Sequence, residues 1–202
     1  MTIATAPVET QPLLLDVSNI TLHITPEQFD KLCADNPDLR LELTATGELI
    51  VMPPAFPISG ERNGDLFGRV WYWNEQTELG RVFDSSTGYD FTAIGGGKPS
   101  PDVSWIEKSR LEGVPLDRFL EVVPDFIIEL RSTTDRLNTL QAKMQGYQRL
   151  GVRLGLLVNP QDKQVEIYRA GQPEMELLEA PLSVSCEDVL PGFVLNLKKI
   201  WS

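Results

Sequence analysis

Long hydrophobic runs, cysteine and histidine are all scarce in this sequence, and each scarcity excludes a class of protein. No stretch approaches the ~18 uninterrupted apolar residues that a membrane-spanning helix needs, so we expect no membrane partner. The N-terminus carries no basic stretch followed by an apolar core, so no secretory signal is visible. Cys33 and Cys186 lie far apart and have neither metal-ligand nor redox spacing. They are typical of buried thiols in a reducing compartment, and we expect a cytoplasmic protein.

Basic residues are outnumbered, with 18 Lys and Arg against 29 Asp and Glu and a formal net charge of −11. Proteins that hold nucleic-acid phosphates do so with Lys and Arg and are typically basic overall or on one face. Any nucleic-acid contact therefore has to come from a local basic cluster, a bound metal or a surface completed by a second subunit. The single histidine, His23, also makes a Ser-His-Asp or Cys-His mechanism hard to build.

What the sequence does contain is the patterning of a globular domain. Its 202 residues can bury a substantial core, and 42% of them are apolar. Periodicity and capping signals predict helices over 26–34 and 60–78 and a third that follows 133–135 and ends at Leu150, with Gly80 and Gly151 closing the last two. Strands are predicted over 39–43, 48–52, 81–84, 89–92, 102–106, 126–131, 154–159, 164–169 and 175–179. A short helix near 116–120 and an extended segment over 189–201 complete the pattern.

This interleaving of helices and strands predicts an α/β or α+β fold. We expect a single domain over 21–202, with a mixed central β-sheet flanked by helices. The first helix and the hairpin at 39–52 would form an N-terminal extension. Residues 1–20 lack lasting periodicity and are predicted to be a flexible tail.

Two acids within apolar strand patterns are the most informative feature of the sequence. Asp102 stands at the head of one such strand, and Glu129 lies inside the next, over 126–131. Burying an unpaired carboxylate is costly, so such an acid is usually paired or bound to a metal. Acids on consecutive strands can converge on one hard cation, and Mg²⁺ prefers one or two carboxylates together with water and phosphate oxygens. The pattern favours metal-assisted phosphodiester chemistry.

Two basic residues accompany these acids. Strand alternation places Arg131 on the same face as Glu129, which leaves an internal Glu129–Arg131 ion pair open as an alternative. Arg131 could otherwise steady that carboxylate or contact a phosphate, but it cannot act as a base. Lys143 borders the apolar stripe of the following helix and could orient a water or stabilise a phosphoryl oxyanion. The alternative for Lys143 is an ammonium group that simply extends into solvent.

Two further motifs are interpreted as structural. The run Gly95-Gly96-Gly97-Lys98-Pro99 lacks the full spacing of a phosphate-binding loop and contains a proline where a helix should begin, which favours a flexible turn. Trp71, Tyr72 and Trp73 could stack on bases, but their place on an amphipathic helix favours a core or subunit-interface role.

The order of these motifs along the chain resembles a known family. Pro101-Asp102 comes first, followed by Glu129-Leu130-Arg131-Ser132, Asp135, Lys143, Tyr147 and Gly151-Val152. This order is similar to that of the Uma2 family of endonucleases, which belongs to the restriction-endonuclease-like, PD-(D/E)XK superfold. Segments 47–54 and 165–169 also resemble the family's segment before its first core helix and the strand after its catalytic helix, so the resemblance spans about 25–201.

The resemblance implies roles for individual residues. Asp102 and Glu129 match the family's metal-binding carboxylates. The superfold's usual lysine position holds Arg131 here, and the resemblance implies that Lys143 on the helix is the catalytic lysine. Many members carry a histidine near the start of the first core helix, which this chain lacks. Glu61 could supply an extra acid from that helix instead.

Together these observations predict a Mg²⁺- or Mn²⁺-dependent endonuclease that acts on nucleic acid, with DNA as the expected substrate. The net charge of −11 and the missing histidine leave open a catalytically inactive, nuclease-like binding or regulatory module. We expect a homodimer, because two subunits can concentrate their few basic side chains and make one cut per strand. Segments 70–73 and 190–201 offer contact surface, although both fit a monomer core equally well.

Overall fold

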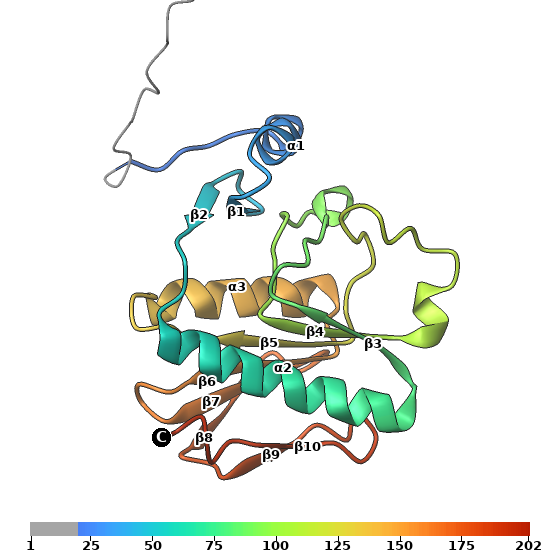
Figure 1. Ribbon diagram of the computed structural model, residues 1–202, viewed down its shortest axis with the longest axis vertical. Coiled ribbons are helices and arrows are strands. Elements are labelled where there is room, and N and C mark those ends of the chain that lie inside the picture. The colour runs from blue at the N-terminus through green and yellow to red at the C-terminus, as the bar shows by residue number, and fades with distance from the viewer. Residues whose placement is uncertain (1–19) are drawn as a thin grey trace, which may run out of the picture.

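A six-stranded mixed sheet lies at the centre of the computed structural model, which describes residues 20–202 (Figure 1). In spatial order its strands are β3 (Gly80–Asp84), β4 (Val103–Glu107), β5 (Phe126–Leu130), β6 (Leu154–Asn159), β7 (Gln164–Arg169) and β8 (Glu176–Glu179). β5 and β6 are parallel and are joined by α3 (Leu137–Leu150), whereas the other neighbouring strands are antiparallel. The predicted mixed central sheet flanked by helices is confirmed.

Both faces of the middle strands are covered, which explains why every residue of β5 and β6 is buried. α2 (Pro57–Thr77) and the C-terminal segment pack on one face, where Phe126 and Ile128 join the larger core. α3 packs on the other face, where Ile127 and Tyr147 belong to a second core. Because side chains alternate along a strand, Glu129 points toward α3 together with Ile127.

Most helix ends lie where the sequence signals predict. Thr25 forms a capping box at the start of α1 (Pro26–Asp35), in which the Gln28 N–H donates to Thr25 Oγ1 at 3.3 Å. Gly151 ends α3 in the left-handed conformation, with a φ of 99°. The end of α2 is an exception, because Glu78 takes the left-handed conformation and Gly80 opens β3 instead of closing the helix.

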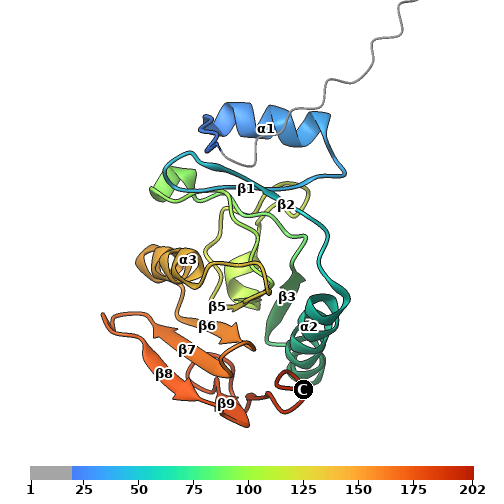
Figure 2. The ribbon, with the colours of Figure 1, turned by 90° about the vertical axis from the view of Figure 1, so that its left-hand side faces the viewer.

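α1 and a two-stranded antiparallel hairpin form an N-terminal unit beside the main sheet. The hairpin consists of β1 (Arg40–Leu43) and β2 (Leu49–Met52), and Phe29, Leu41 and Leu43 form a small core of their own. Figures 1 and 2 show this unit at one end of the molecule, with α1 outermost and β1 between α1 and α3. The predicted helix and hairpin extension is therefore confirmed.

Two predictions for the connections between strands are wrong. The segment predicted as a strand over 89–92 forms only an isolated bridge between Tyr89 and Leu120 before the short 3-10 helix η1 (Thr92–Ile94). Asp90 accepts a hydrogen bond from the Thr92 N–H at 3.0 Å, a local turn that competes with strand pairing. The helix predicted near 116–120 is not found, and the 3-10 helix η2 (Lys108–Leu111) lies earlier in that connection.

The C-terminal region also differs from its prediction. Only β10 (Val194–Asn196) is a strand within the extended segment predicted over 189–201. It pairs with β9 (Ser183–Ser185), which the sequence reasoning did not identify. Strands of three residues carry too little alternation to be found from sequence.

Two predictions concern the extent of the domain, and the structure tests neither of them. The single domain over 21–202 stays a prediction, and the predicted tail over 1–20 lies outside the described residues except for Ile20. Within the described part of the chain, no helix combines the length and the apolar character needed to cross a membrane.

Candidate active site

The two acids singled out in the sequence occupy opposed positions at the junction of β4 and β5. Val103 pairs with Ile128 in these antiparallel strands, so Asp102 and Glu129 are the next pair outward. Opposed residues direct their side chains to the same face of a sheet, here the face that α3 covers. From α3, the Lys143 ammonium lies 2.9 Å from Glu129 Oε1. The structure thus brings Asp102, Glu129 and Lys143 into one place.

Two donors hold the Asp102 carboxylate. The Leu130 N–H donates to Oδ2 at 2.8 Å, and Asn63 Nδ2 donates to Oδ1 at 2.7 Å. Burial raises the pKa of Asp102, while the Leu130 N–H and the Lys143 ammonium oppose that rise. Asn63 links α2 to the site, a contact that the sequence reasoning did not predict.

The Glu129 carboxylate is 4% exposed and has both its partners on α3. Its Oε1 accepts a hydrogen bond from the Tyr147 hydroxyl at 3.0 Å and lies 2.9 Å from Lys143 Nζ. Burial raises the pKa of Glu129 to about 8, Lys143 opposes this rise, and the Asp102 and Glu42 carboxylates reinforce it. Additional positive charge at this point would therefore favour the ionised form of Glu129.

Lys143 bridges carboxylates from two parts of the fold. Its Nζ lies 2.9 Å from Glu129 Oε1 on the main sheet and 3.0 Å from Glu42 Oε1 on β1. Burial would lower the pKa of Lys143, but the two carboxylates outweigh burial and raise it. Lys143 therefore stays protonated, and the alternative that its ammonium extends into solvent is wrong.

Glu42 belongs to this cluster although the sequence reasoning missed it. The side chain is 4% exposed, and its Oε1 accepts a hydrogen bond from the Ser100 N–H at 2.8 Å in addition to the contact with Lys143. Leu41 and Leu43 face the small core of the N-terminal unit, so Glu42 faces the main sheet. The signal that could have found it is this alternation, an acid between two buried leucines of a short strand.

Residues 97–102, which we call the strap, connect the N-terminal unit to the main sheet. Within the strap, Lys98 exchanges backbone hydrogen bonds of 2.7 and 3.1 Å with Leu43 on β1. Ser100 then holds the Glu42 carboxylate, and the strap ends at Asp102. The strap therefore fixes two acids of the site, from separate sheets, relative to each other.

The glycine-rich run that enters the strap is held firmly. A Cβ on Gly97 would lie 2.0 Å from the Leu43 carbonyl oxygen, so only glycine permits this close backbone approach. The Lys98 ammonium, in a side chain that is 4% exposed, pairs with Asp30 on α1 at 2.6 Å and with Asp90 at 2.8 Å. The predicted turn is present, since Gly95 ends η1 in the left-handed conformation, and tertiary contacts hold the residues that follow it.

The two accessory candidates lie away from these acids. Arg131 Nη1 pairs with Asp162 Oδ2 at 2.9 Å, and no Glu129–Arg131 ion pair occurs within residues 20–202, so that alternative is wrong. Glu61 precedes Asn63 by two positions on α2, which turns its side chain about 200° around the helix axis. Since Asn63 faces the site, Glu61 points elsewhere and lines a separate cavity of about 260 Å³.

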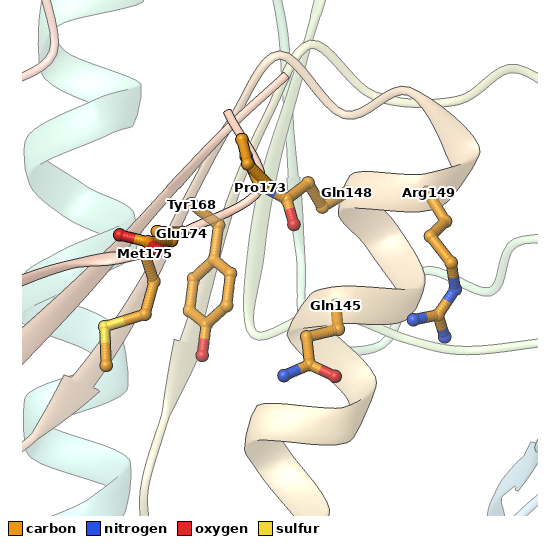
Figure 3. A pocket seen from close by; sticks show the side chains of 7 residues that line it. All are labelled: Gln145, Gln148, Arg149, Tyr168, Pro173, Glu174 and Met175. Atoms are coloured by element: carbon orange, nitrogen blue, oxygen red, sulfur yellow. The ribbon is translucent and has the colours of Figure 1, made fainter. Parts of the chain in front are cut away.

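A larger cavity, of about 560 Å³, lies between α3 and the segment that leads into β8 (Figure 3). Its lining consists of Gln145, Gln148, Arg149, Tyr168, Pro173, Glu174 and Met175. None of these residues contacts the carboxylates described above through a hydrogen bond or ion pair. The cavity is thus separate from the candidate active site.

The donor set fits a hard divalent cation. Glu42, Asp102 and Glu129 influence one another electrostatically, and Lys143 is the ammonium among them. With all three acids ionised, one lysine leaves two excess negative charges, which a divalent cation would balance. Carboxylate oxygens are the ligands that Mg²⁺ and Mn²⁺ prefer. No group of three or more His, Cys, Asp and Glu side chains in the described chain is arranged to hold a metal, so the fit rests on the opposed Asp102 and Glu129.

Comparisons with known proteins give one family and one shared fold. Residues 26–198 match the family model described as "Uma2: Putative restriction endonuclease". Among solved structures, the chain is similar to the crystal structure of "a putative nuclease belonging to DUF820" from Anabaena variabilis ATCC 29413, with a TM-score of 0.69 and 20% sequence identity. That match covers 80% of this chain and 89% of that chain. No curated protein matches the sequence.

Proposed function

Since the chain belongs to the Uma2 family, we propose that it is a metal-dependent endonuclease that hydrolyses phosphodiester bonds of nucleic acid. DNA is the expected substrate, and Mg²⁺ or Mn²⁺ is the expected cofactor. In this proposal Asp102 and Glu129 hold the metal, and Lys143 stabilises negative charge on the phosphate. Such a substrate is consistent with a cytoplasmic protein.

The observation that carries the proposal is the opposed placement of Asp102 and Glu129 with Lys143 beside them. Glu129 is buried and Asp102 is partly buried, and ionised acids this close on neighbouring strands repel each other, which raises the free energy of the metal-free state. The strands, α3 and the strap all contribute to holding that arrangement. Such a free-energy cost in the metal-free protein is expected at a site that binds a cation.

The side chains of the site support distinct roles in phosphodiester hydrolysis. A bound Mg²⁺ or Mn²⁺ ion supplies Lewis-acid chemistry, lowering the pKa of water and polarising a phosphoryl oxygen. The Leu130 N–H and the Asn63 amide orient the Asp102 carboxylate, and the Tyr147 hydroxyl orients Glu129. Lys143 stays protonated, so it donates hydrogen bonds to developing phosphate charge instead of acting as a base.

One observation favours a second candidate, a nuclease-like module without catalytic activity. The Lys143 ammonium contacts both Glu42 and Glu129, so part of the charge that would attract a metal is already balanced. The net charge of −11 also opposes binding of a polyanion. Calorimetric titration with Mg²⁺ and Mn²⁺ separates the candidates, because the inactive module would give neither heat nor a thermal shift.

A homodimer is part of the proposal. The helix residues Val70 and Trp73 are buried in the chain's own core, as are Leu190 and Leu195 of the C-terminal segment. These residues are therefore not free to contact a second subunit. Trp71 and Tyr72, on the outer side of α2, are 46% and 64% exposed and offer the aromatic contact surface instead.

Cleavage of supercoiled plasmid DNA and of labelled RNA tests the proposal directly. With Mg²⁺ or Mn²⁺ the wild-type protein is expected to nick or cut DNA, and Asp102→Asn and Glu129→Gln are expected to abolish cutting. Glu75→Gln is the matched control, because Glu75 is an exposed acid on α2 outside the site. Full cleavage by both site variants would refute the assignment, and cutting of RNA alone would correct the substrate.

A further inference from the structure

Basic side chains that could meet a nucleic-acid phosphate are rare around the candidate active site. Arg131 is paired with Asp162, Lys98 with Asp30 and Asp90, and Lys143 with the site acids. Arg40 differs from these, since it is exposed and forms no ion pair with any residue among 20–202. Its position relative to the site is fixed by two observations.

The first observation is the side to which Arg40 points. β1 alternates between the small core of the N-terminal unit, which receives Leu41 and Leu43, and the main sheet, which receives Glu42. Residues two apart on a strand share a face, so Arg40 lies on the same side as Glu42. The alternation thus turns the Arg40 guanidinium toward the main sheet.

The second observation is the hydrogen bond that Arg40 makes across the gap between the two sheets. Its Nη2 donates to the Ser85 carbonyl oxygen, in the loop that follows β3. Asp84 pairs with Val103 in the antiparallel β3–β4 ladder, so Ser85 is the next position outward and lies opposite Asp102. Arg40 is therefore anchored beside a proposed metal ligand.

From this geometry we propose that Arg40 binds a phosphate group of the nucleic-acid backbone next to the bond that is cut. The inference rests on the proposed nuclease function and adds a substrate contact to it. A guanidinium carries five N–H donors in a planar fork that suits two phosphate oxygens, and only one of them is engaged by Ser85. In a chain of net charge −11, an exposed and unpaired cation at the site is the clearest anchor for a polyanion.

A purely structural role for Arg40, as a link between the hairpin and the Ser85 loop, is the alternative. It predicts that loss of Arg40 lowers thermal stability and leaves the salt dependence of substrate binding unchanged. A phosphate contact predicts instead that loss of Arg40 changes the salt dependence of substrate binding, because each lost contact reduces the slope of log K against log salt by about one. Arg40→Lys, which keeps the charge and loses the fork, should retain that slope and only part of the affinity.

The test compares Arg40→Gln, Arg40→Lys and the control Arg81→Gln. Arg81 is an exposed arginine at the other end of β3, without an ion pair in the described chain. Binding of a labelled DNA duplex is measured by fluorescence anisotropy over a salt series, with Ca²⁺ replacing Mg²⁺ to slow hydrolysis. We expect Arg40→Gln to weaken binding about tenfold or more and to reduce the salt slope by about one, whereas Arg81→Gln changes neither.

The outcomes separate this inference from the proposed function. If wild type cuts DNA and Arg40→Gln binds it with wild-type affinity and slope, the role of Arg40 is refuted and the nuclease assignment stands. If wild type binds but never cuts, and Arg40→Gln weakens that binding with the reduced slope, the phosphate contact stands and the activity is refuted. If wild type binds neither DNA nor RNA, both are refuted.

Discussion

Lys143 shows how one residue constrains the chemistry available at this site. Its ammonium contacts Glu42 and Glu129, and these carboxylates hold its pKa above the usual range. A lysine in that state is a hydrogen-bond donor and cannot accept a proton from water. The activated water of the proposed reaction therefore depends on the metal, and Glu129 must serve both the metal and Lys143.

Glu42 and Glu61 provide a second comparison between residues, since each could be the third acid of the proposed nuclease site. The structure places Glu42 against Lys143 and turns Glu61 away from the site. We expect Glu42→Gln to reduce DNA cleavage at least about tenfold, the lower end of what supporting residues of metal sites contribute. Glu61→Gln should cleave at the wild-type rate. Equal losses in the two variants, measured with the same plasmid assay, would contradict this assignment.

The two cysteines should differ in reactivity. Burial raises the pKa of the Cys186 thiol to about 12, whereas Cys33 is only half-buried, although burial raises its pKa as well. Because the thiolate is the reactive form, a thiol reagent at pH 8 should label Cys33 slowly and Cys186 not at all in the folded protein. Both should react in denaturant. Mass spectrometry of the labelled peptides checks this, and labelling of native Cys186 would contradict the burial.

Among the elements of the fold, the strap brings residues of two separate sheets into one site. Its backbone pairs with β1, its Ser100 N–H holds Glu42, and it ends at Asp102. The Lys98 side chain adds an ion pair with Asp30 on α1. A change in the strap should therefore affect catalysis and stability together.

Gly97→Ala tests the strap. The added Cβ would lie 2.0 Å from the Leu43 carbonyl oxygen, so the backbone must shift and the pairing with β1 is lost. We expect the free energy of unfolding in urea to fall by about 2–3 kcal/mol, as for other overpacked sites, and cleavage to fall with it. Gly68→Ala is the control, because a Cβ there meets nothing within 4 Å and alanine favours the helix. Equal stability of the two variants would show that the strap tolerates movement.

The elements that sequence alone predicted correctly are those with strong local signals. β6 and β7 were predicted with their observed bounds, because each is an apolar or alternating run flanked by turn residues. The strand predicted over 89–92 was wrong, and the strand at 183–185 was missed. Neither a turn made by the Asp90 side chain nor a three-residue strand pairing produces a periodic pattern in the sequence. Local pattern is sufficient only where tertiary contacts do not override it.

The candidate site was predictable to the extent that its acids lie in apolar strands. Asp102 and Glu129 could be singled out because acids rarely occupy such positions without a partner. Asn63 could not, because its contact with Asp102 depends on how α2 packs on the sheet. Glu42 left a local signal, an acid between two leucines of a short strand, but its contact with Lys143 depends on how the N-terminal unit packs on the sheet. Packing between distant segments leaves no signal in a single sequence.

At the scale of the whole molecule, the net charge of −11 is the property that the proposed function has to overcome. A local anchor such as Arg40 and a metal at Asp102 and Glu129 would provide positive charge where a phosphate binds. A dimer would bring two such places together. The proposal therefore requires strong salt dependence of DNA binding despite the overall acidity.

The homodimer is tested by light scattering at micromolar concentration. We expect about twice the 22.6 kDa of one chain for wild type and the mass of one chain for the double variant Trp71→Ser, Tyr72→Ser. Leu177→Ser is the control, because Leu177 is also exposed but lies on β8. A wild-type mass near 22.6 kDa that does not change on dilution or with metal would exclude the dimer.

The proposed function depends above all on whether Asp102 and Glu129 hold a divalent cation, which a crystal structure with Mn²⁺ would decide. We expect an anomalous peak between the two carboxylates, with oxygen ligands at about 2.1–2.2 Å, and a Lys143 ammonium that has moved toward Glu42. Crystals of Asp102→Asn under the same conditions should show no peak. An unoccupied site at saturating Mn²⁺, with Lys143 still bridging Glu42 and Glu129, would refute metal binding at these acids and favour the inactive module.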